Sequence, residues 1–159
     1  MKHPQIESQD RLLDDVNWRI LQALQADARI PFAELGRQVG LSAPAVTERV
    51  RRLEDAGIIA GYHADINLAR IGRPIMAIIR IGNPGERNTD VADLVRGIPE
   101  VLECHRITGK ESFVVRVAVP TVEHLERLLD MLEPFGQTTT SLILSSPVER
   151  RIIAPPEGE

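Results

Sequence analysis

The stretch FAELGRQVGLSAPAVTERVRRLEDAG, residues 32–57, decides the fold of the first half of the chain. Its apolar side chains recur at helical spacing on both sides of Gly40, a residue type that commonly ends a helix. Ser42 suits the N-cap of the second of these helices and Pro44 suits its first turn, whereas Gly57 favours its end. The stretch therefore predicts two helices joined by a short turn that contains glycine.

A supporting helix is expected before this stretch, with Asp14 or Asp15 as its N-cap. Gly36 lies on the apolar stripe of the second helix, where it costs about 1 kcal/mol of helix propensity relative to alanine, so we expect a close contact there. Ile58 and Ile59, followed by the alternating Tyr62, Ala64 and Ile66, predict a short strand or wing at residues 58–66. Helix, turn, helix with a supporting helix is the helix-turn-helix arrangement, although any small helical bundle has similar spacing.

The third helix carries three arginines on its polar side, within residues 49–52, in a chain whose net charge is −4. Arginine forms bidentate hydrogen bonds with phosphate or guanine, and glutamate accepts a hydrogen bond from cytosine. The front of such a helix reaches base edges, while flanking arginines contact phosphates, so the pattern favours DNA binding over a merely solvated face. The residues expected to face the groove are Ser42, Pro44, Thr47, Glu48 and Arg51, and those expected to contact phosphate are Arg49 and Arg52.

The overall composition excludes several classes of protein. A net charge of −4 argues against bulk attraction to nucleic acid, so any DNA contact requires a local surface. The single cysteine, Cys104, excludes an intramolecular disulfide framework. No signal peptide is evident in the first ten residues, and no apolar run approaches the roughly 20 residues that span a bilayer. We therefore expect a cytoplasmic protein without a membrane partner.

The second half of the chain alternates between strand and helix patterns. The order is strand, helix, strand, strand, helix, strand, which is the ferredoxin-like βαββαβ arrangement, so the fold class is α+β. The strands are expected at residues 75–81, 101–108, 112–119 and 137–145, with Thr89 and Thr121 as helix N-caps. We expect a winged helix-turn-helix domain at residues 1–62, a linker strand at 63–74, the βαββαβ domain at 75–146 and a loose tail at 147–159.

Two of these strands are apolar on both faces. Ile75, Ile79 and Ile81 share one face of the first strand, while Met76 and Ile78 lie on the other. Helices in this fold cover only one face of the sheet, and a solvated face should be polar at alternate positions. The simplest cover for the second face is another copy of the chain, which predicts a two-fold symmetric homodimer.

Residues from both halves resemble the Lrp/AsnC (feast/famine) transcription regulators of bacteria and archaea. The stretches that carry the resemblance are LD at 13–14, IL at 20–21, DARI at 27–30, LS at 41–42, RVRRLE at 49–54, GIIAGY at 57–62, VLECHRITG at 101–109 and TTS at 139–141. The second half is similar to the RAM domain of that family. The resemblance implies a regulator that binds double-stranded DNA, dimerises through its second domain and often forms octamers.

The resemblance also implies a small effector, usually an amino acid, bound between dimers. The family's effector site involves the turn after the second strand of the RAM domain and hydroxyls on the last strand. Carried over to this chain, the positions are Gly109, Lys110, Glu111, Ser112, Thr139 and Ser141. Lys110 and Ser112 stand where acidic residues occur in some members, which leaves the effector's identity open. An ordinary hairpin turn would also explain Gly109.

Two alternative functions are kept, and no catalytic residues, metal ligands or cofactor are expected. Cys104 and His105 are adjacent on a strand, so their side chains point to opposite faces and cannot share a metal ion. Sirohaem decarboxylases resemble the same family while doing tetrapyrrole chemistry, but the arginines of the third helix would have no purpose there. A RAM-type amino-acid sensor that does not bind DNA is the other alternative.

Overall fold

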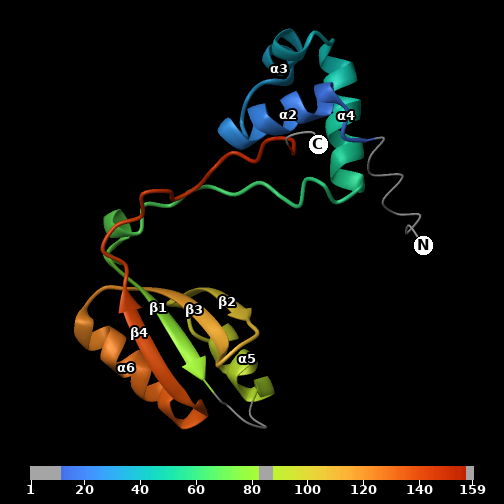
Figure 1. Ribbon diagram of the computed structural model, residues 1–159. Coiled ribbons are helices and arrows are strands. Elements are labelled where there is room, and N and C mark those ends of the chain that lie inside the picture. The colour runs from blue at the N-terminus through green and yellow to red at the C-terminus, as the bar shows by residue number, and fades with distance from the viewer. Residues whose placement is uncertain (1–11, 83–87, 157–159) are drawn as a thin grey trace, which may run out of the picture. The chain divides into compact units, whose positions relative to one another are not determined.

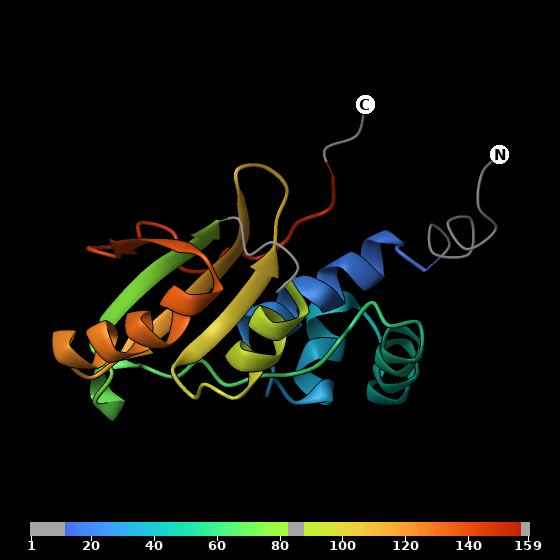
Figure 2. The same ribbon diagram turned by 90° about the horizontal axis from the view of Figure 1, so that it is seen from below.

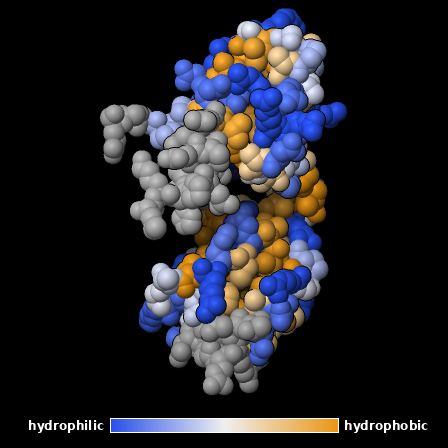
Figure 3. Space-filling view, turned by 90° about the vertical axis from the view of Figure 1, so that its right-hand side faces the viewer, coloured by the Kyte–Doolittle hydropathy of each residue, from blue (hydrophilic) through white to orange (hydrophobic). Residues whose placement is uncertain are grey.

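The computed structural model describes residues 12–82 and 88–156, which form two separate units (Figure 1). We call the first the helical unit; its described residues are 12–65 together with 148–156. The second, residues 66–147, is the sheet unit. In the described ranges, no helix combines the length and apolar content that a bilayer span needs. Hydrophobic side chains reach the surface in both units (Figure 3).

The described part of the helical unit contains three helices: α2 (Asp15–Ala26), α3 (Phe32–Val39) and α4 (Ala43–Asp55). The predicted N-caps of α2 and α4 are confirmed. Asp14 Oδ1 accepts a hydrogen bond from the backbone N–H of Asn17 at 2.7 Å, and Ser42 Oγ accepts one from that of Ala45 at 3.4 Å. The helices enclose an aliphatic core of Ile20, Leu24, Leu35, Val39, Val46, Val50 and Leu53.

Two glycines shape the turn between α3 and α4. Gly40 adopts φ 77°, the left-handed conformation that glycine takes most easily, and thereby ends α3. A Cβ atom on Gly36 would lie 2.4 Å from the carbonyl oxygen of Leu41, so only glycine fits where this turn crosses α3. The backbone N–H of Leu41 donates to the Gly36 carbonyl at 2.8 Å, which fixes the crossing. The predicted close contact at Gly36 is thus with the turn itself.

The wing expected after α4 is absent, because residues 58–66 form no strand. The N–H groups of Ile58 and Ile59 donate instead to the Leu53 carbonyl, at 2.9 and 3.1 Å, and thereby close the end of α4. Both isoleucines pack against the helical core, which accounts for their apolar character without a β ladder. The linker at 63–74 likewise contains a short 3₁₀ helix, Ala69–Ile71, rather than a strand.

The sheet unit has the predicted βαββαβ order. Its elements are β1 (Ile75–Gly82), α5 (Asn88–Arg96), β2 (Val101–Arg106), β3 (Glu111–Val119), α6 (Val122–Leu132), a 3₁₀ turn (Glu133–Phe135) and β4 (Gln137–Leu142). The strands lie in the order β2-β3-β1-β4, and each neighbouring pair is antiparallel. Thr121 caps α6 as predicted by accepting from the backbone N–H of His124, at 3.2 Å. Thr89, the other expected cap, instead lies within α5, because that helix begins at Asn88.

Both helices of the sheet unit cover the same face of the sheet (Figure 2). The core beneath them is built from alternate residues of β1 and β3, including Ile79 and its partner Val115. The other face, which we call the open face, carries Met76 and Ile78 from β1 and Val114 and Ala118 from β3. Among the described residues, neither core cluster includes any of these four side chains, although Ala118 is itself buried.

The segment 148–156 is part of the helical unit, which contradicts the expectation of a loose tail. Its backbone at Ile153 exchanges two hydrogen bonds with the side chain of Gln25, on α2. The segment has no regular secondary structure, so hydrophobic periodicity could not indicate this contact.

We predict that Gly36→Ala destabilises the helical unit by about 1–3 kcal/mol, despite alanine's higher helix propensity, because the added methyl group overlaps the Leu41 carbonyl. Urea unfolding of both proteins measures the difference. Gly97→Ala is the matched control, since its Cβ would meet only the Leu94 carbonyl at an ordinary 3.4 Å. Equal or higher stability of the Gly36 variant would contradict the close contact.

Candidate functional site

The outward side of α4 brings most of the predicted DNA-binding residues together. Val46, Val50 and Leu53 face the core and are buried, which turns the opposite side of the helix to solvent. We call this exposed surface the outer strip. Its members are Ser42, Pro44, Thr47, Glu48, Arg51 and Arg52, all of which are exposed. The spacing of three and four residues along one helix makes the strip continuous.

Charges on the outer strip are held by weak ion pairs along the helix. Arg52 Nε lies 2.9 Å from Glu48 Oε1, and Arg51 Nε lies 3.6 Å from Asp55 Oδ2. The side chains of Arg51 and Arg52 are nevertheless 72% and 63% exposed. Surface pairs of this kind contribute about 0–1 kcal/mol, so either guanidinium group can exchange its carboxylate for another anion at little cost. The strip is thus a polar, exposed surface whose ion pairs are weak.

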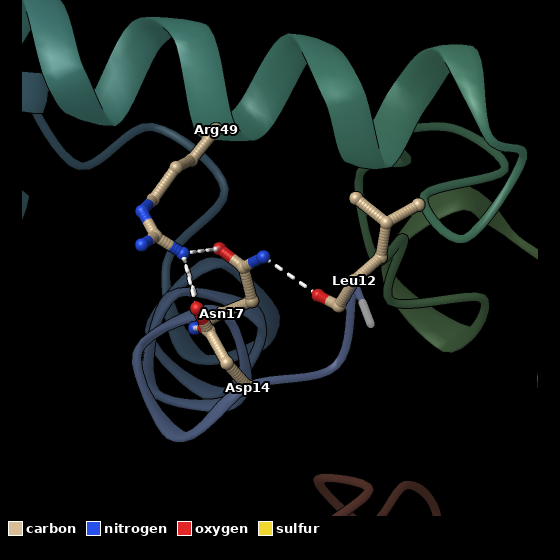
Figure 4. Close-up of polar contacts among 4 residues, drawn as sticks. All are labelled: Leu12, Asp14, Asn17 and Arg49. Atoms are coloured by element: carbon tan, nitrogen blue, oxygen red, sulfur yellow. Dashed lines mark hydrogen bonds and ion pairs between the residues drawn. The ribbon is translucent and has the colours of Figure 1, made fainter. Parts of the chain in front are cut away.

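Arg49 points away from the outer strip and binds α2 (Figure 4). Its Nη1 atom lies 2.7 Å from Asp14 Oδ2 and 3.0 Å from Asn17 Oδ1. Asn17 is buried, and its Nδ2 atom donates to the Leu12 carbonyl at 2.6 Å. The expectation that Arg49 contacts phosphate stays a prediction, since its side chain is 31% exposed while it makes these contacts. Its contacts fasten the middle of α4 to the first turn of α2.

The charge on Asp14 is stabilised by the same contacts. Burial acts to raise the pKa of Asp14, but hydrogen bonds from the Arg49 guanidinium and the backbone N–H of Asn17 outweigh it and hold the pKa below its usual value. Asp14 therefore serves two helices at once, as the N-cap of α2 and as the anion opposite Arg49. The sequence signals its capping role alone, because the partner arginine lies 35 residues away along the chain.

Tyr62 fastens the other end of α4. Its hydroxyl group donates to Glu54 Oε1 at 2.8 Å. Burial, together with the Glu54 carboxylate, raises the pKa of Tyr62 to about 12, so the phenol stays protonated and keeps donating even at alkaline pH where an ordinary tyrosine would ionise. Sequence reasoning placed Tyr62 on a wing and missed this role. A lone aromatic residue soon after a helix carries no signal for the partner of its hydroxyl group.

The predicted effector residues lie on different strands and at different levels of the sheet, because Thr139 and Ser141 pair with Arg80 and Ile78 of β1, whereas the turn with Gly109 lies beyond the Gly82–Glu111 pair. Gly109, in the turn between β2 and β3, adopts φ 119°, which favours glycine. Thr139 and Ser141 lie on β4, with β1 between them and β3. Two strand spacings are about 10 Å, so the turn and the hydroxyl groups of one chain do not meet. Arg80 was not predicted at this site, yet its Nη2 atom donates to Ser141 Oγ at 3.0 Å.

Cys104 and His105 lie on opposite faces of β2, as predicted. Cys104 pairs with Val115 and packs against the core, whereas His105 pairs with Val114 on the open face. Within the described residues, no group of three or more His, Cys, Asp or Glu side chains is arranged to hold a metal ion.

Two protein-family models match the chain, one for each unit. The AsnC-type helix-turn-helix domain matches residues 13–54, which include α2, α3 and α4. The Lrp/AsnC ligand binding domain matches residues 76–153, which include the sheet. The order of the two matches agrees with the order of the units along the chain.

Curated relatives and solved structures agree with these matches. The chain is 39% identical to YezC of Bacillus subtilis, named an uncharacterized HTH-type transcriptional regulator, over 84% of this chain and 95% of that protein. It superposes on the structure of LrpC from the same species with a TM-score of 0.82 at 30% identity, covering 87% of this chain and 99% of that one. A transcriptional regulator of Neisseria meningitidis, solved as an L-Met complex, gives a TM-score of 0.82 at 27% identity and covers 89% and 96% of the two chains.

We predict that Asp14→Asn lowers stability at neutral pH by up to about 1 kcal/mol, because asparagine keeps the cap but loses the charge that faces the partly exposed Arg49. A carboxylate with a depressed pKa stabilises the fold above its unfolded pKa, and this contribution disappears as the pH falls through the folded value. The two proteins should therefore begin to converge in stability below about pH 4, and they should converge fully only below the lowered folded pKa of Asp14. Urea unfolding from pH 7 to pH 3 measures this convergence.

The control for this experiment is the same substitution in an Arg49→Met background. Without the guanidinium group, Asp14→Asn should change stability less at pH 7, and the pH dependence of its effect should be smaller. An unchanged effect in that background would show that Arg49 does not stabilise the Asp14 carboxylate.

Proposed function

The chain belongs to the Lrp/AsnC family of transcriptional regulators, and we propose that it binds double-stranded DNA in a sequence-specific manner through the outer strip of α4. The observation that carries this proposal is the exposure of Ser42, Thr47, Glu48 and Arg51 on one side of a helix whose other side is fixed in the core. A rigid helix of this kind, second in a helix-turn-helix, fits the major groove.

The members of the strip divide by their reach. We assign Ser42, Pro44, Thr47, Glu48 and Arg51 to the groove, since the front and centre of a recognition helix meet base edges. Arg52 lies on the flank and is assigned to phosphate. Arg49 has a positioning role, because its contacts with Asp14 and Asn17 fasten α4 to the start of α2.

A homodimer that responds to an effector completes the proposal. A second copy of the chain would cover the apolar side chains of the open face, such as Met76, Ile78 and Val114, and two-fold pairing suits a divided DNA site. Because the Gly109 turn and the hydroxyl groups of Thr139 and Ser141 are separated in one chain, we propose that the effector site forms where the turn of one copy meets β4 of another.

The remaining residues of the proposed effector site are Lys110, Glu111 and Ser112, with Arg80 beside Ser141. Turn N–H groups and Arg80 suit a carboxylate, whereas Glu111 suits an ammonium group. An amino acid carries both groups, and the Neisseria relative was solved with one bound. Dimers are proposed to assemble further into octamers, in the cytoplasm, where the DNA lies.

We predict that Arg51→Ala weakens binding to a selected operator by about 1–3 kcal/mol and relaxes the preference for one base pair, because a bidentate contact to a base edge is lost. Operator DNA is first selected from a random pool by the parent protein, and affinity is then measured by fluorescence anisotropy. Arg96→Ala is the matched control, since Arg96 is also an exposed helical arginine paired with an aspartate on its own helix, Asp93.

Arg52→Ala provides the contrast to Arg51. A lost phosphate contact should weaken all sequences equally and reduce the salt dependence of binding by about one charge, without changing base preference. Parental affinity and base preference in the Arg51 variant would refute the groove assignment.

We predict that Gly109→Val abolishes the response to amino acids, because valine resists φ 119° and forces the turn into another backbone conformation. The response is the change in operator affinity on adding each of the twenty amino acids, with L-methionine as the first probe. Gly72→Val is the control for backbone strain, since Gly72 also has a positive φ, of 83°, in the same unit. A full response in the Gly109 variant would contradict the proposed effector site.

A further inference from the structure

The side chain of Gln25 binds the backbone of a distant segment. Its Oε1 atom accepts a hydrogen bond from the Ile153 N–H at 2.8 Å, and its Nε2 atom donates to the Ile153 carbonyl at 3.1 Å. A primary amide that pairs with both polar groups of one residue imitates the pairing of neighbouring strands. The contact therefore recognises an extended backbone, and it joins residues separated by 128 positions in sequence.

An ion pair secures the same segment three residues earlier. Arg150 Nη1 lies 3.0 and 2.9 Å from the two carboxylate oxygens of Asp65. Asp65 follows α4 at the end of the first part of the helical unit, so the segment is held at both α2 and the chain leaving α4. We call residues 148–156, which carry both contacts, the strap.

The strap borders an apolar pocket of the helical unit. Its volume is about 400 Å³, and Arg150 and Ile153 of the strap form part of its wall. The opposite wall comes from α2 and the residues after α4, including Trp18, Ile58 and Tyr62. Trp18 is the sole tryptophan of the chain, so its fluorescence reports on this pocket.

The strap comes after β4 along the chain, and β4 is the strand that carries the hydroxyl groups of the proposed effector site. Five residues, 143–147, separate the end of β4 from the strap and span at most about 18 Å. The start of β1 lies beside the end of β4, since Ala77 pairs with Leu142 and the Ile143 N–H donates to the Met76 carbonyl. The segment that leads from α4 into the sheet therefore joins β1, and the segment that leads back towards α2 leaves from the neighbouring strand, β4.

We propose that the strap binds reversibly to the pocket of its own helical unit and forms a second connection through which β4 acts on the DNA-binding helices. The contacts are individually weak, since the side chains of Arg150 and Asp65 are 60% and 82% exposed and Ile153 is 67% exposed. Attachment to the same chain compensates for this weakness, because a short tether gives an effective concentration in the millimolar range. An effector that displaces β4 then changes how firmly the strap is held.

Docking of the strap is tested first, without DNA. In a chain that ends at Pro147, Trp18 emission should shift to longer wavelength, because one wall of its pocket is lost. In full-length Gln25→Leu, the same shift should appear, and the Ile153 amide should exchange its hydrogen faster than in the parent. Gln22→Leu is the matched control, since Gln22 is on α2 but lines a different surface, beside Arg19 and Val39.

A charge exchange separates docking from simple damage. Asp65→Arg and Arg150→Asp should each shift Trp18 emission, and the double variant should restore the parental spectrum by rebuilding the pair in reverse. Docking would be overturned if the truncated chain kept the parental Trp18 emission and the Gln25 variant kept the parental exchange rate at Ile153. A double variant whose emission is no closer to the parental spectrum than that of either single variant would also overturn it.

The link to DNA binding rests on the proposed function and is measured separately. Strap variants should still bind the selected operator, but the amino-acid-induced change in affinity should fall towards onefold. The coupling would be overturned if undocked variants kept the full amino-acid-induced change in operator affinity that the parent shows. It would also be overturned if no amino acid altered the operator affinity of the parent. A parent that binds no DNA refutes the proposed function, while the fluorescence and exchange results still decide whether the strap docks.

Discussion

The helical unit depends on α4, whose two sides have different roles: one is buried in the core and the other is exposed. Val46, Val50 and Leu53 hold one side of this helix in the core, so its polar side stays exposed. Gly36 lets the turn that precedes α4 cross α3 at contact distance. Burial of this apolar stripe supplies most of the stabilisation and sets which side of the helix faces outward. Arg49 also fastens the middle of α4 to the start of α2 through Asp14 and Asn17, and Tyr62 adds a contact with Glu54 near the far end.

A similar asymmetry governs the sheet unit. Both helices cover one face, and Ile79, Val115 and their neighbours form a dry aliphatic core beneath them. The open face mixes apolar side chains with polar groups such as Arg80 and Ser141. This mixture suits an interface better than a face kept in water, since interfaces combine an apolar centre with hydrogen-bonding groups. Each unit thus exposes the surface on which its proposed partner would bind.

Local signals in the sequence predict most of the fold. Ser42, Asp14 and Thr121 indicate the starts of their helices because an N-cap acts within three residues, and the βαββαβ order follows from periodicities inside single elements. Sequence-based prediction falls short where the local pattern does not indicate which group a residue contacts. Ile58 and Ile59 stand just before the alternating Tyr62, Ala64 and Ile66 and so suggest a strand, yet their N–H groups close α4 at Leu53. Arg49 belongs to a dense basic cluster in the sequence, but its partner is a carboxylate 35 residues earlier. The outer strip was predictable because it only requires knowing which side of one helix is apolar.

The helical unit is discontinuous along the chain, and this affects how the protein is made. Domains fold from the N-terminus as the ribosome releases them. The three helices therefore emerge and can collapse early, whereas the strap is synthesised only after the whole sheet unit has followed. During translation the pocket beside Trp18 lacks the wall that Arg150 and Ile153 later provide. A nascent chain thus holds its helical unit in an unfinished form until the strap has been synthesised.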